Sequence, residues 1–394
     1  MHVVWITKSE WRKPGPIVYM GLLNAASFAQ SGTNANFYVG AGEPSDTISD
    51  LSEFYGVDAD DALVVRRIAA DASRGARSVY RAACDGVASL ASTRKRVLVL
   101  TREIGVLPAL LRIRRRHRDR VAVIHEAHDF YATIDHLPAR SVSAYRRMWA
   151  ERSLLPKIDG LLCITEFQRA LYQEHFSRLP IMAWPLGCTA QDGEVDPEAR
   201  RRLRRVVYLG HPHQTKGLDL ILDIAARLRD AGVQFEILGG SSHKGERLDS
   251  TIRAAGVATH VRATPFLSPA AMHTRLRREL SVGLVPLEDT FYNRYLTCPV
   301  KALDCLAHGI PIVASDLPSV RAVAGSAAAY CPPGDADAFA RRILDLLDDE
   351  RAYAAAFRSS RARAAELSWC HRAQAIASFG ETLFQRRSHT VRAD

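Results

Sequence analysis

Two histidines and two carboxylates crowd one short stretch of the chain. The segment VIHEAHDFY, residues 123–131, carries His125, Glu126, His128 and Asp129 directly after an apolar run. That run predicts a buried strand, so the polar side chains fall at a strand's carboxyl end. A His–Asp pair there can act as acid and base or polarise a substrate hydroxyl, so His128 and Asp129 are the candidate catalytic residues. The alternative is a structural cluster that holds the loop to the core. We expect no metal, because the HxxH spacing has no supporting ligand motif.

Two glycine-containing turns could hold a diphosphate. TKSEWRKPGPIVYMG, residues 7–21, places Gly15 between a predicted strand and a predicted helix. VVYLGHPHQTKGLDLIL, residues 206–222, places His211 and Lys216 in the same way. The N–H groups and dipole of a helix N-terminus bind anions, and Lys216 can neutralise a departing phosphate. A plain turn and a Lys-Gly helix cap are the alternative interpretations.

A third turn carries more information. YLTCPVKALDCLAHGIPIVASDLPSV, residues 295–320, holds Pro299 where it fits the first turn of a helix. The helix start at Thr297 and Pro299 is a further candidate site for an anion. Lys301 and Asp304 lie three residues apart on one helix face, and Asp304, one turn deeper, could hold ribose hydroxyls. A helical Lys–Asp pair worth about 0.2–0.5 kcal/mol is the alternative explanation.

Short continuous apolar runs alternate with helical patterns in two series. Continuous runs are typical of parallel strands that are buried on both faces. The first series predicts strands at 3–7, 37–40, 97–101, 121–125 and 161–165, and the second at 206–209, 235–238, 260–263, 282–286, 312–315 and 329–331. The polar segment 185–205 predicts a linker between them. We therefore expect an α/β fold of two Rossmann-like, doubly wound domains with a ligand cleft between them.

Length and cysteine content support the same class. A chain of 394 residues is too long for one ordinary core and predicts two domains. Its seven cysteines are scattered singly without a CxxC pair, which argues against a disulfide framework and a zinc site. No apolar stretch approaches the roughly 20 residues that span a bilayer, and the first residues lack a secretory signal pattern. A cytoplasmic location is the expectation.

The chain is basic, with a formal net charge of +10. Arginines cluster in RIRRRHRDR, residues 112–120, and RRRLRR, residues 200–205. Such patches attract polyanions, namely nucleic acid, an anionic membrane face or phosphorylated substrates. Solvated helix faces are the alternative. Aromatic residues are not interleaved with the arginines, so we expect no nucleic acid partner.

Together these motifs resemble a known family. GHPHQTKG, GLVPLED, PVKALDCLAHGIPIVASDLPSV and ELSW are similar to nucleotide-sugar glycosyltransferases of the GT-B fold, nearest to the retaining "group 1" enzymes. The resemblance is strong over about 205–370, and architectural over 1–185. It implies an acceptor-binding domain at 1–185 completed by a crossing helix at 370–387, and a nucleotide-sugar-binding domain at 186–369.

The resemblance also implies roles for the phosphate-binding residues. Lys216 matches the lysine that contacts the donor diphosphate. An arginine commonly stands where this chain has His211. A subset of the family carries Pro-x-Lys in the later stretch, as this chain does, and Lys301 would then face the phosphates.

Three further positions are carried over. Asp304 matches the acidic residue that binds the nucleotide ribose. The family often has a second acid eight positions earlier, where this chain has Leu296, so a usual contact to the donor sugar is missing. His128 matches the family's histidine, with Asp129 beside it.

We therefore expect a hexosyltransferase that moves a sugar from a UDP- or GDP-type donor to a hydroxyl acceptor such as a lipid-linked glycan, a polysaccharide or a small molecule. Fixed cations and helix starts would stabilise the leaving diphosphate, so neither cofactor nor metal is expected. Retention of configuration is implied by the resemblance alone. The alternatives are a sugar-nucleotide 2-epimerase of the same fold and a non-catalytic basic binding protein. The patch at 112–120 could also dock the enzyme peripherally on an anionic inner membrane face that presents a lipid-linked acceptor.

Overall fold

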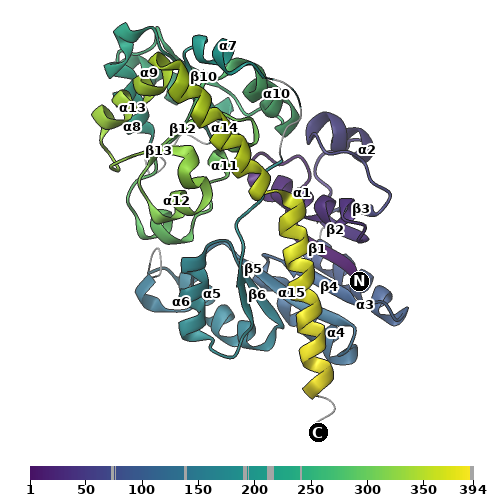
Figure 1. The fold of residues 1–394 in the computed structure, drawn as a ribbon. Coiled ribbons are helices and arrows are strands. Elements are labelled where there is room, and N and C mark those ends of the chain that lie inside the picture. Colours follow the sequence, from purple (N-terminus) through teal and green to yellow (C-terminus); the bar gives the residue numbers. More distant parts are fainter. Residues whose placement is uncertain are drawn as a thin grey trace. The chain divides into compact units, whose positions relative to one another are not determined.

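The computed structural model describes residues 1–71, 75, 77–136, 140–189, 193, 195–210, 217–239 and 242–390. Side chains are described for these residues except 242–247 and 387–390. Contacts divide the chain into two units (Figure 1). Unit 1 comprises Met1–Pro185 and Trp369–Asp394, and unit 2 comprises Leu186–Ser368.

Unit 1 is built on a parallel sheet of seven strands in the order β3-β2-β1-β4-β5-β6-β7. The strands are β1 (His2–Glu10), β2 (Ala35–Gly40), β3 (Leu63–Ile68), β4 (Val97–Thr101), β5 (Val121–Ala127), β6 (Gly160–Cys163) and β7 (Ile181–Ala183). The strand order reverses between β1 and β4. In doubly wound sheets, ligands bind beyond the carboxyl ends of the strands at such a reversal.

The helices of unit 1 cover both faces of this sheet (Figure 1). They are α1 (Pro16–Gln30), α2 (Thr47–Ser49), α3 (Arg77–Ser92), α4 (Leu107–Arg116), α5 (Val142–Leu154), α6 (Glu166–His175) and α15 (Trp369–Thr390). Because helices lie on both sides, β4 and β5 are buried along their whole length. This burial explains why both strands are continuous apolar runs in the sequence.

The last helix, α15, packs on unit 1 although unit 2 precedes it in the chain (Figure 1). Two glycines allow the close approach. A Cβ on Gly380 of α15 would lie 2.8 Å from the Leu98 side chain of β4. A Cβ on Gly160 of β6 would lie 2.8 Å from the Phe379 side chain of α15. The predicted helix that crosses back onto the first domain is confirmed.

Unit 2 repeats the architecture with six parallel strands in the order β10-β9-β8-β11-β12-β13. The strands are β8 (Arg205–Leu209), β9 (Gln234–Leu238), β10 (Val261–Thr264), β11 (Val282–Val285), β12 (Ile312–Ser315) and β13 (Ala328–Cys331). The helices are α7 (Pro197–Arg202), α8 (Leu218–Arg227), α9 (Ser242–Ala254), α10 (Pro269–Glu279), α11 (Val300–Ala307), α12 (Pro318–Ala324), α13 (Ala336–Asp348) and α14 (Glu350–Glu366). The order reverses between β8 and β11.

The predicted class, two doubly wound parallel α/β domains, is confirmed, and the differences lie at sheet edges. Sequence reasoning missed β3 and β7, the two edge strands of unit 1. β3 carries Arg66 and Arg67 and is only partly buried, and β7 has three residues. The expected linker 185–205 contains α7, whose N-terminus is capped by the Asp196 carboxylate.

The basic run at 200–205 serves unit 2 internally, which neither interpretation of the sequence anticipated. Arg200 is buried and donates to the carbonyl oxygens of His308 and Arg277. The other arginines form ion pairs within the unit: Arg201 and Arg202 with Glu198, Arg204 with Asp348, and Arg205 with Glu279. This run therefore offers little free charge to a polyanion.

Two histidines share a hydrogen bond in the interior of unit 2. His273 Nδ1 and His308 Nε2 are 2.8 Å apart, and both side chains are buried. Burial lowers the pKa of His273 to about 4 and that of His308 to about 2. Both rings are therefore neutral near pH 7, and one donates to the other.

We predict that this pair makes the stability of the protein fall in mild acid. An unfolded histidine titrates near 6.5, so below about pH 6.5 the unfolded state binds more protons than the folded state. The free energy of unfolding should fall by up to about 2.7 kcal/mol per pH unit for two rings, until the pH nears 4. Urea unfolding at several pH values should show a shallower slope when His273→Asn and His308→Asn are combined. Replacing the exposed His175 with Gln is the control, and parallel curves for wild type and double variant would contradict the prediction.

Candidate functional site

In unit 1, the predicted histidine is paired with a carboxylate two residues before it. His128 Nε2 lies 2.5 Å from Glu126 Oε1. Burial lowers the pKa of the His128 imidazole, although Glu126 opposes the shift. A neutral ring beside an ionised carboxylate donates from Nε2, which leaves Nδ1 as a hydrogen-bond acceptor.

Glu126 is itself held by the C-terminal helix. Its carboxyl is 2% exposed, and Oε2 lies 2.5 Å from Arg372 Nη2. Burial alone would raise the pKa of this carboxyl, but the Arg372 guanidinium and the His128 hydrogen bond outweigh burial and lower it. Glu126 is therefore ionised at neutral pH. The contact joins α15 to the end of β5.

Arg372 uses its other donors on three more acceptors. Nε donates to Asn24 Oδ1 of α1 at 3.0 Å, and Nη1 donates to the carbonyl oxygens of Trp184 and Pro185 at 2.6 and 2.7 Å. The side chain is fully buried. Each of its three nitrogens is therefore satisfied, and its orientation is fixed.

Asp129 takes a different direction from His128. Its carboxylate is about half exposed and lies 4.0 Å from Arg147 of α5. Its backbone carbonyl accepts hydrogen bonds from Gln168 Nε2 and Tyr172 Oη of α6. The structure thus pairs His128 with Glu126, while Asp129 fixes the loop through its backbone.

A buried carboxyl group supports the same loop from α5. Glu151 Oε1 lies within hydrogen-bond distance of Tyr172 Oη, and Oε2 accepts from the Tyr131 N–H, both at 3.0 Å. Burial raises the pKa of Glu151 to about 8, so it is largely neutral at pH 7. Sequence reasoning missed Glu151, because its partners lie 20 residues away or more and no spacing motif marks them.

Sequence reasoning also missed Glu103, which follows β4 at the point where the strand order reverses. Its carboxylate accepts from Tyr80 Oη at 2.9 Å and from Thr7 Oγ1 at 3.4 Å, and lies 3.3 Å from Lys8 Nζ. Thr7 and Lys8 belong to β1. A Thr-Arg-Glu run directly after an apolar strand is the signal that could have found it.

Gly15 stands at the start of α1, as the sequence predicts. Its φ is +118°, a conformation that side-chain-bearing residues rarely adopt, while an added Cβ would meet nothing within 4 Å. The glycine is therefore required by the backbone rather than by space. No side chain caps the first turn, and that turn has no acidic residue.

In unit 2, four predicted residues lie on α11 or directly ahead of it. Thr297 is buried ahead of the helix, and Pro299 is the N-cap residue rather than a first-turn residue. Lys301 Nζ lies 4.0 Å from the ring centre of Tyr208 in β8. The start of α11 therefore lies beside the first strand of this sheet.

Asp304, the fourth of these residues, lies half-buried one turn into α11. Burial raises the pKa of its carboxyl to about 7. Within the described part of the chain the carboxylate has no hydrogen-bonding or ion-pair partner, so the proposed Lys301–Asp304 pair is not formed. A half-buried carboxylate without donors is incomplete until some group supplies them.

His211 and Lys216 lie outside the described residues. The glycines on either side of this segment are described. Gly210 and Gly217 have φ of +119° and +84°, and a Cβ on Gly217 would lie 2.1 Å from the Pro286 carbonyl oxygen. The turn from β8 to α8 therefore requires glycine at Gly217, which is the N-cap of α8.

Several solved structures share this fold. Sucrose-phosphate synthase from Thermosynechococcus elongatus has a TM-score of 0.71 at 17% identity, over 98% of this chain and 99% of that chain. TarM from S. aureus, in complex with UDP among other ligands, scores 0.70 at 11% over 97% and 99%. HepE from Anabaena, in complex with UDP, scores 0.68 at 14% over 97% and 100%. Identities this low show the fold alone, and that is the GT-B fold.

A family comparison decides the class of protein. Residues 204–349 match the family model described as "Glycosyl transferases group 1". This stretch, which lies within unit 2, is therefore similar to the group 1 glycosyltransferases. The protein is a transferase enzyme of the GT-B fold, as the sequence predicts. No curated protein matches the chain.

The position of Leu296 bears on how this transferase holds its donor. Leu296 is buried ahead of α11, at the position where the family resemblance implies an acidic residue. An apolar core side chain cannot accept a hydrogen bond from a sugar hydroxyl. Any contact to the donor sugar must come from other groups.

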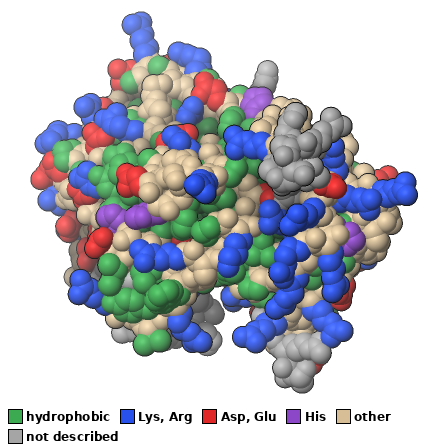
Figure 2. All heavy atoms as spheres, turned by 90° about the horizontal axis from the view of Figure 1, so that it is seen from below, with side chains coloured by type: hydrophobic (Ala, Val, Ile, Leu, Met, Phe, Trp, Pro, Cys, Tyr) green, Lys and Arg blue, Asp and Glu red, His purple; other side chains and the backbone are tan. Residues whose placement is uncertain are grey.

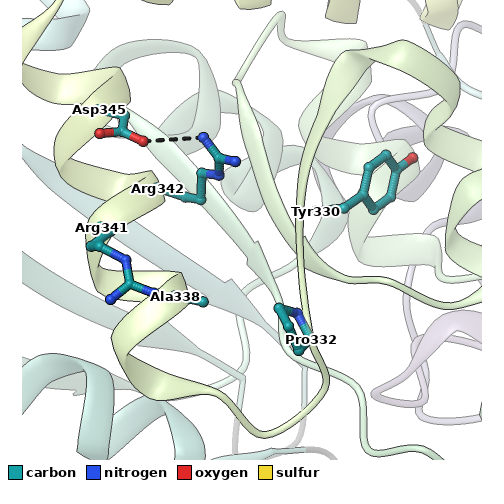
Figure 3. A pocket seen from close by; sticks show the side chains of 6 residues that line it. All are labelled: Tyr330, Pro332, Ala338, Arg341, Arg342 and Asp345. Atoms are coloured by element: carbon teal, nitrogen blue, oxygen red, sulfur yellow. Dashed lines mark hydrogen bonds and ion pairs between the residues drawn. The ribbon is translucent and has the colours of Figure 1, made fainter.

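The transferase also has a surface pocket at the edge of unit 2 (Figure 3). It is lined by Tyr330, Pro332, Ala338, Arg341, Arg342 and Asp345. None of the predicted site residues lines it. Its arginines are exposed, and Arg342 pairs with Asp345 at 3.3 Å. The pocket therefore lacks the buried polar groups that would mark a built binding site.

The described residues include neither a cluster of metal ligands nor a helix suited to span a membrane. Among them, no three His, Cys, Asp or Glu side chains are grouped so that they could hold a metal ion. No helix that the structure describes is long and apolar enough to cross a bilayer.

We predict that Glu151→Gln makes the transferase more stable at neutral and basic pH. The folded-state pKa is about 8 and an unfolded glutamate titrates near 4.3, so between these values the folded state binds the extra proton. Wild-type stability should therefore fall as the pH rises, by about 1.4 kcal/mol per pH unit relative to the variant. Chemical unfolding at pH 5.5, 6.5 and 7.5 measures this difference. A difference that stays constant would show that Glu151 is already ionised in the folded protein.

Proposed function

We propose that the transferase moves a sugar from a nucleoside diphosphate sugar of the UDP type to a hydroxyl acceptor. One observation carries the donor site: α11 of the group 1 domain presents a lysine at its start and an unpartnered, half-buried Asp304 one turn later. Two of the solved structures of this fold, HepE and TarM, are described as complexes with UDP. A GDP-type donor is the other outcome that the experiment below distinguishes.

The diphosphate needs positive charge where the bond to the sugar breaks. Negative charge grows on the leaving diphosphate as the sugar becomes oxocarbenium-like, and fixed cations and helix dipoles stabilise that state. In this proposal Lys301 and the backbone N–H groups that follow Pro299 supply part of this stabilisation. Lys216 and His211, between Gly210 and α8, supply the rest. We infer that transfer needs no metal and, from the family resemblance, that it retains the anomeric configuration.

Asp304 binds the ribose. An ionised carboxylate accepts hydrogen bonds from two neighbouring hydroxyls, which are the donors that the structure leaves Asp304 without. The nearby Cys188 and Cys305 thiols have pKa values raised by burial, so they stay neutral. Ribose binding therefore favours the ionised carboxylate.

His128 positions a hydroxyl of the substrate. Its Nε2–H is committed to Glu126, so Nδ1 accepts a hydrogen bond from a sugar or acceptor hydroxyl. In this proposal Gly15 and the open start of α1 lie at the same carboxyl edge of the sheet and can meet the donor phosphates. Asp129 positions the loop that carries His128.

We predict that nucleotide affinity rises with pH through the titration of Asp304. With a pKa of about 7, roughly a tenth of the carboxyl groups are ionised at pH 6 and nine tenths at pH 8. Affinity for UDP should therefore rise about tenfold over this range, and Asp304→Asn should remove that rise. Isothermal calorimetry with UDP, GDP and ADP measures it and identifies the donor class. Asp345→Asn, an exposed carboxylate of the same unit, is the control.

The outcomes separate the candidate functions. Binding of one nucleotide, weakened in Asp304→Asn and unchanged in Asp345→Asn, supports the donor site. Incubation with the matching nucleotide sugar then distinguishes transfer to an acceptor from 2-epimerisation of the donor. If no nucleotide binds wild type, the donor site is wrong and the basic surface becomes the alternative origin of function.

An anionic membrane is the partner that we propose for unit 1. The end of α4 and the turn after it carry the exposed Arg115, Arg116 and Arg118, and Arg94, Lys95 and Arg96 precede β4. Figure 2, which views the molecule from below relative to Figure 1, shows Lys and Arg side chains gathered on part of this face. Such a surface attracts anionic lipid headgroups.

Helix α5 adds apolar side chains beside this basic surface. Arg114 of α4 bonds the Lys157 carbonyl and pairs with Asp159 in the turn after α5, so the two helices are neighbours. On α5, Val142 and Trp149 lie seven residues apart on one face and are 75% and 68% exposed. Exposed tryptophan next to arginine is typical of side chains at a membrane interface.

We predict that Arg115→Gln combined with Arg116→Gln weakens binding to vesicles rich in phosphatidylserine. Each cation near an anionic surface is worth about 1 kcal/mol, so two losses predict roughly 30-fold weaker co-sedimentation. Trp149→Ala should weaken it further. The matched control replaces Arg351 and Arg358, two exposed arginines of α14. Equal vesicle binding by wild type and all variants would contradict the proposal.

A further inference from the structure

The C-terminal helix reaches the candidate catalytic histidine through one carboxylate. Arg372 of α15, Glu126 of β5 and His128 form a continuous chain of two contacts, each 2.5 Å long. We propose that Arg372 is a positioning residue for the transfer reaction, because it keeps Glu126 in the form that fixes the ring tautomer of His128. The proposal rests on the role of His128 proposed above.

Burial makes Glu126 depend on Arg372. The carboxylate is 2% exposed and the guanidinium is fully buried, so neither charge is stabilised by water. A buried carboxylate without a cation takes up a proton, because desolvation disfavours the charged form. Arg372 is the cation that lowers the pKa of Glu126 most, and it contacts the carboxylate directly.

Loss of Arg372 would reverse the hydrogen bond to the ring. With Glu126 ionised, His128 Nε2–H donates to Oε1, and Nδ1 is an acceptor. With Glu126 protonated, the carboxyl O–H donates to Nε2, and the ring proton moves to Nδ1. The ring nitrogen that should accept from a substrate hydroxyl then becomes a donor. A wrong tautomer is costly even when a catalytic site keeps its geometry.

Among the described groups that face His128, Glu126 is the carboxylate that can fix the tautomer of its ring. From β5 it is faced by Glu126 and by His125, whose pKa burial lowers to about 4. Arg102, after β4, and Arg372, on α15, are the cations that act on it. Among these described neighbours, Glu126 is the one that accepts a hydrogen bond from the ring.

Hydrogen bonds also fix the orientation of the Arg372 side chain. Its hydrogen bonds to Asn24 and to the Trp184 and Pro185 carbonyls fix the plane of the guanidinium. Arg372 follows the boundary between Ser368 and Trp369, and Pro185 ends the first segment of unit 1. The residue that orders the histidine therefore also ties together the two places where the chain leaves and re-enters unit 1.

Nitrogen NMR of histidine-labelled protein tests the proposal directly. In wild type, the proton of His128 should reside on Nε2. In Arg372→Met it should shift to Nδ1, and kcat should fall by at least about tenfold, while UDP affinity stays within about twofold. Arg372→Lys keeps the charge, so it should retain the Nε2–H tautomer and most of kcat. Arg386→Met, an exposed arginine of the same helix, is the control.

A second variant keeps the test decisive if Arg372→Met does not fold. Combining Glu126→Leu with Arg372→Met removes both buried charges, which proteins often tolerate. His128 should then populate both tautomers, and kcat should again fall at unchanged UDP affinity. A pure Nε2–H tautomer with wild-type kcat in either charge-removing variant would overturn the proposal. If UDP does not bind wild type, the proposed function fails, while the tautomer measurement still decides the role of Arg372.

Discussion

A guanidinium and a carboxylate that are buried together must each be matched, because an isolated charge is unstable in an apolar interior. In unit 1 this condition is met by Arg372 and Glu126. Hydrogen bonds connect this pair to His128 on one side, and to α1 and the segment that follows β7 on the other. The ion pair that allows both charges to be buried therefore also fixes the side chain of His128, which is proposed to position a substrate hydroxyl.

In unit 2, by contrast, a half-buried carboxyl group has no matching cation within the described part of the chain. Asp304 has no partner among the described residues, and burial raises its pKa to about 7. A partly buried carboxylate without hydrogen-bond donors has a free-energy cost in the free protein, and a ligand with hydroxyl donors removes it. That cost therefore favours ligands of this kind. The polar groups of unit 1 are therefore already paired, whereas in the proposed function a substrate completes the site in unit 2.

The sequence predicts the fold and part of the site for identifiable reasons. Central strands are continuous apolar runs, and the helix that carries Lys301 and Asp304 is marked by proline at its start and glycine at its end, so both could be found locally. Arg372 could not, because its partner Glu126 is 246 residues away and its surroundings look like an ordinary helix. Glu151 was missed for the same reason. Edge strands β3 and β7 escaped because they are partly buried and lack a full apolar pattern.

The place of α15 in the chain has a consequence for synthesis on the ribosome. Unit 1 is interrupted by the whole of unit 2, so Glu126 is made long before Arg372. The two residues are 246 positions apart, so at about 5–20 residues per second the wait is roughly 12–50 s. During that time the nascent first segment lacks both the helix that covers its sheet and the cation that matches its carboxylate. Unit 2 is contiguous, so its last residue is made before unit 1, whose sheet begins earlier in the chain, is complete.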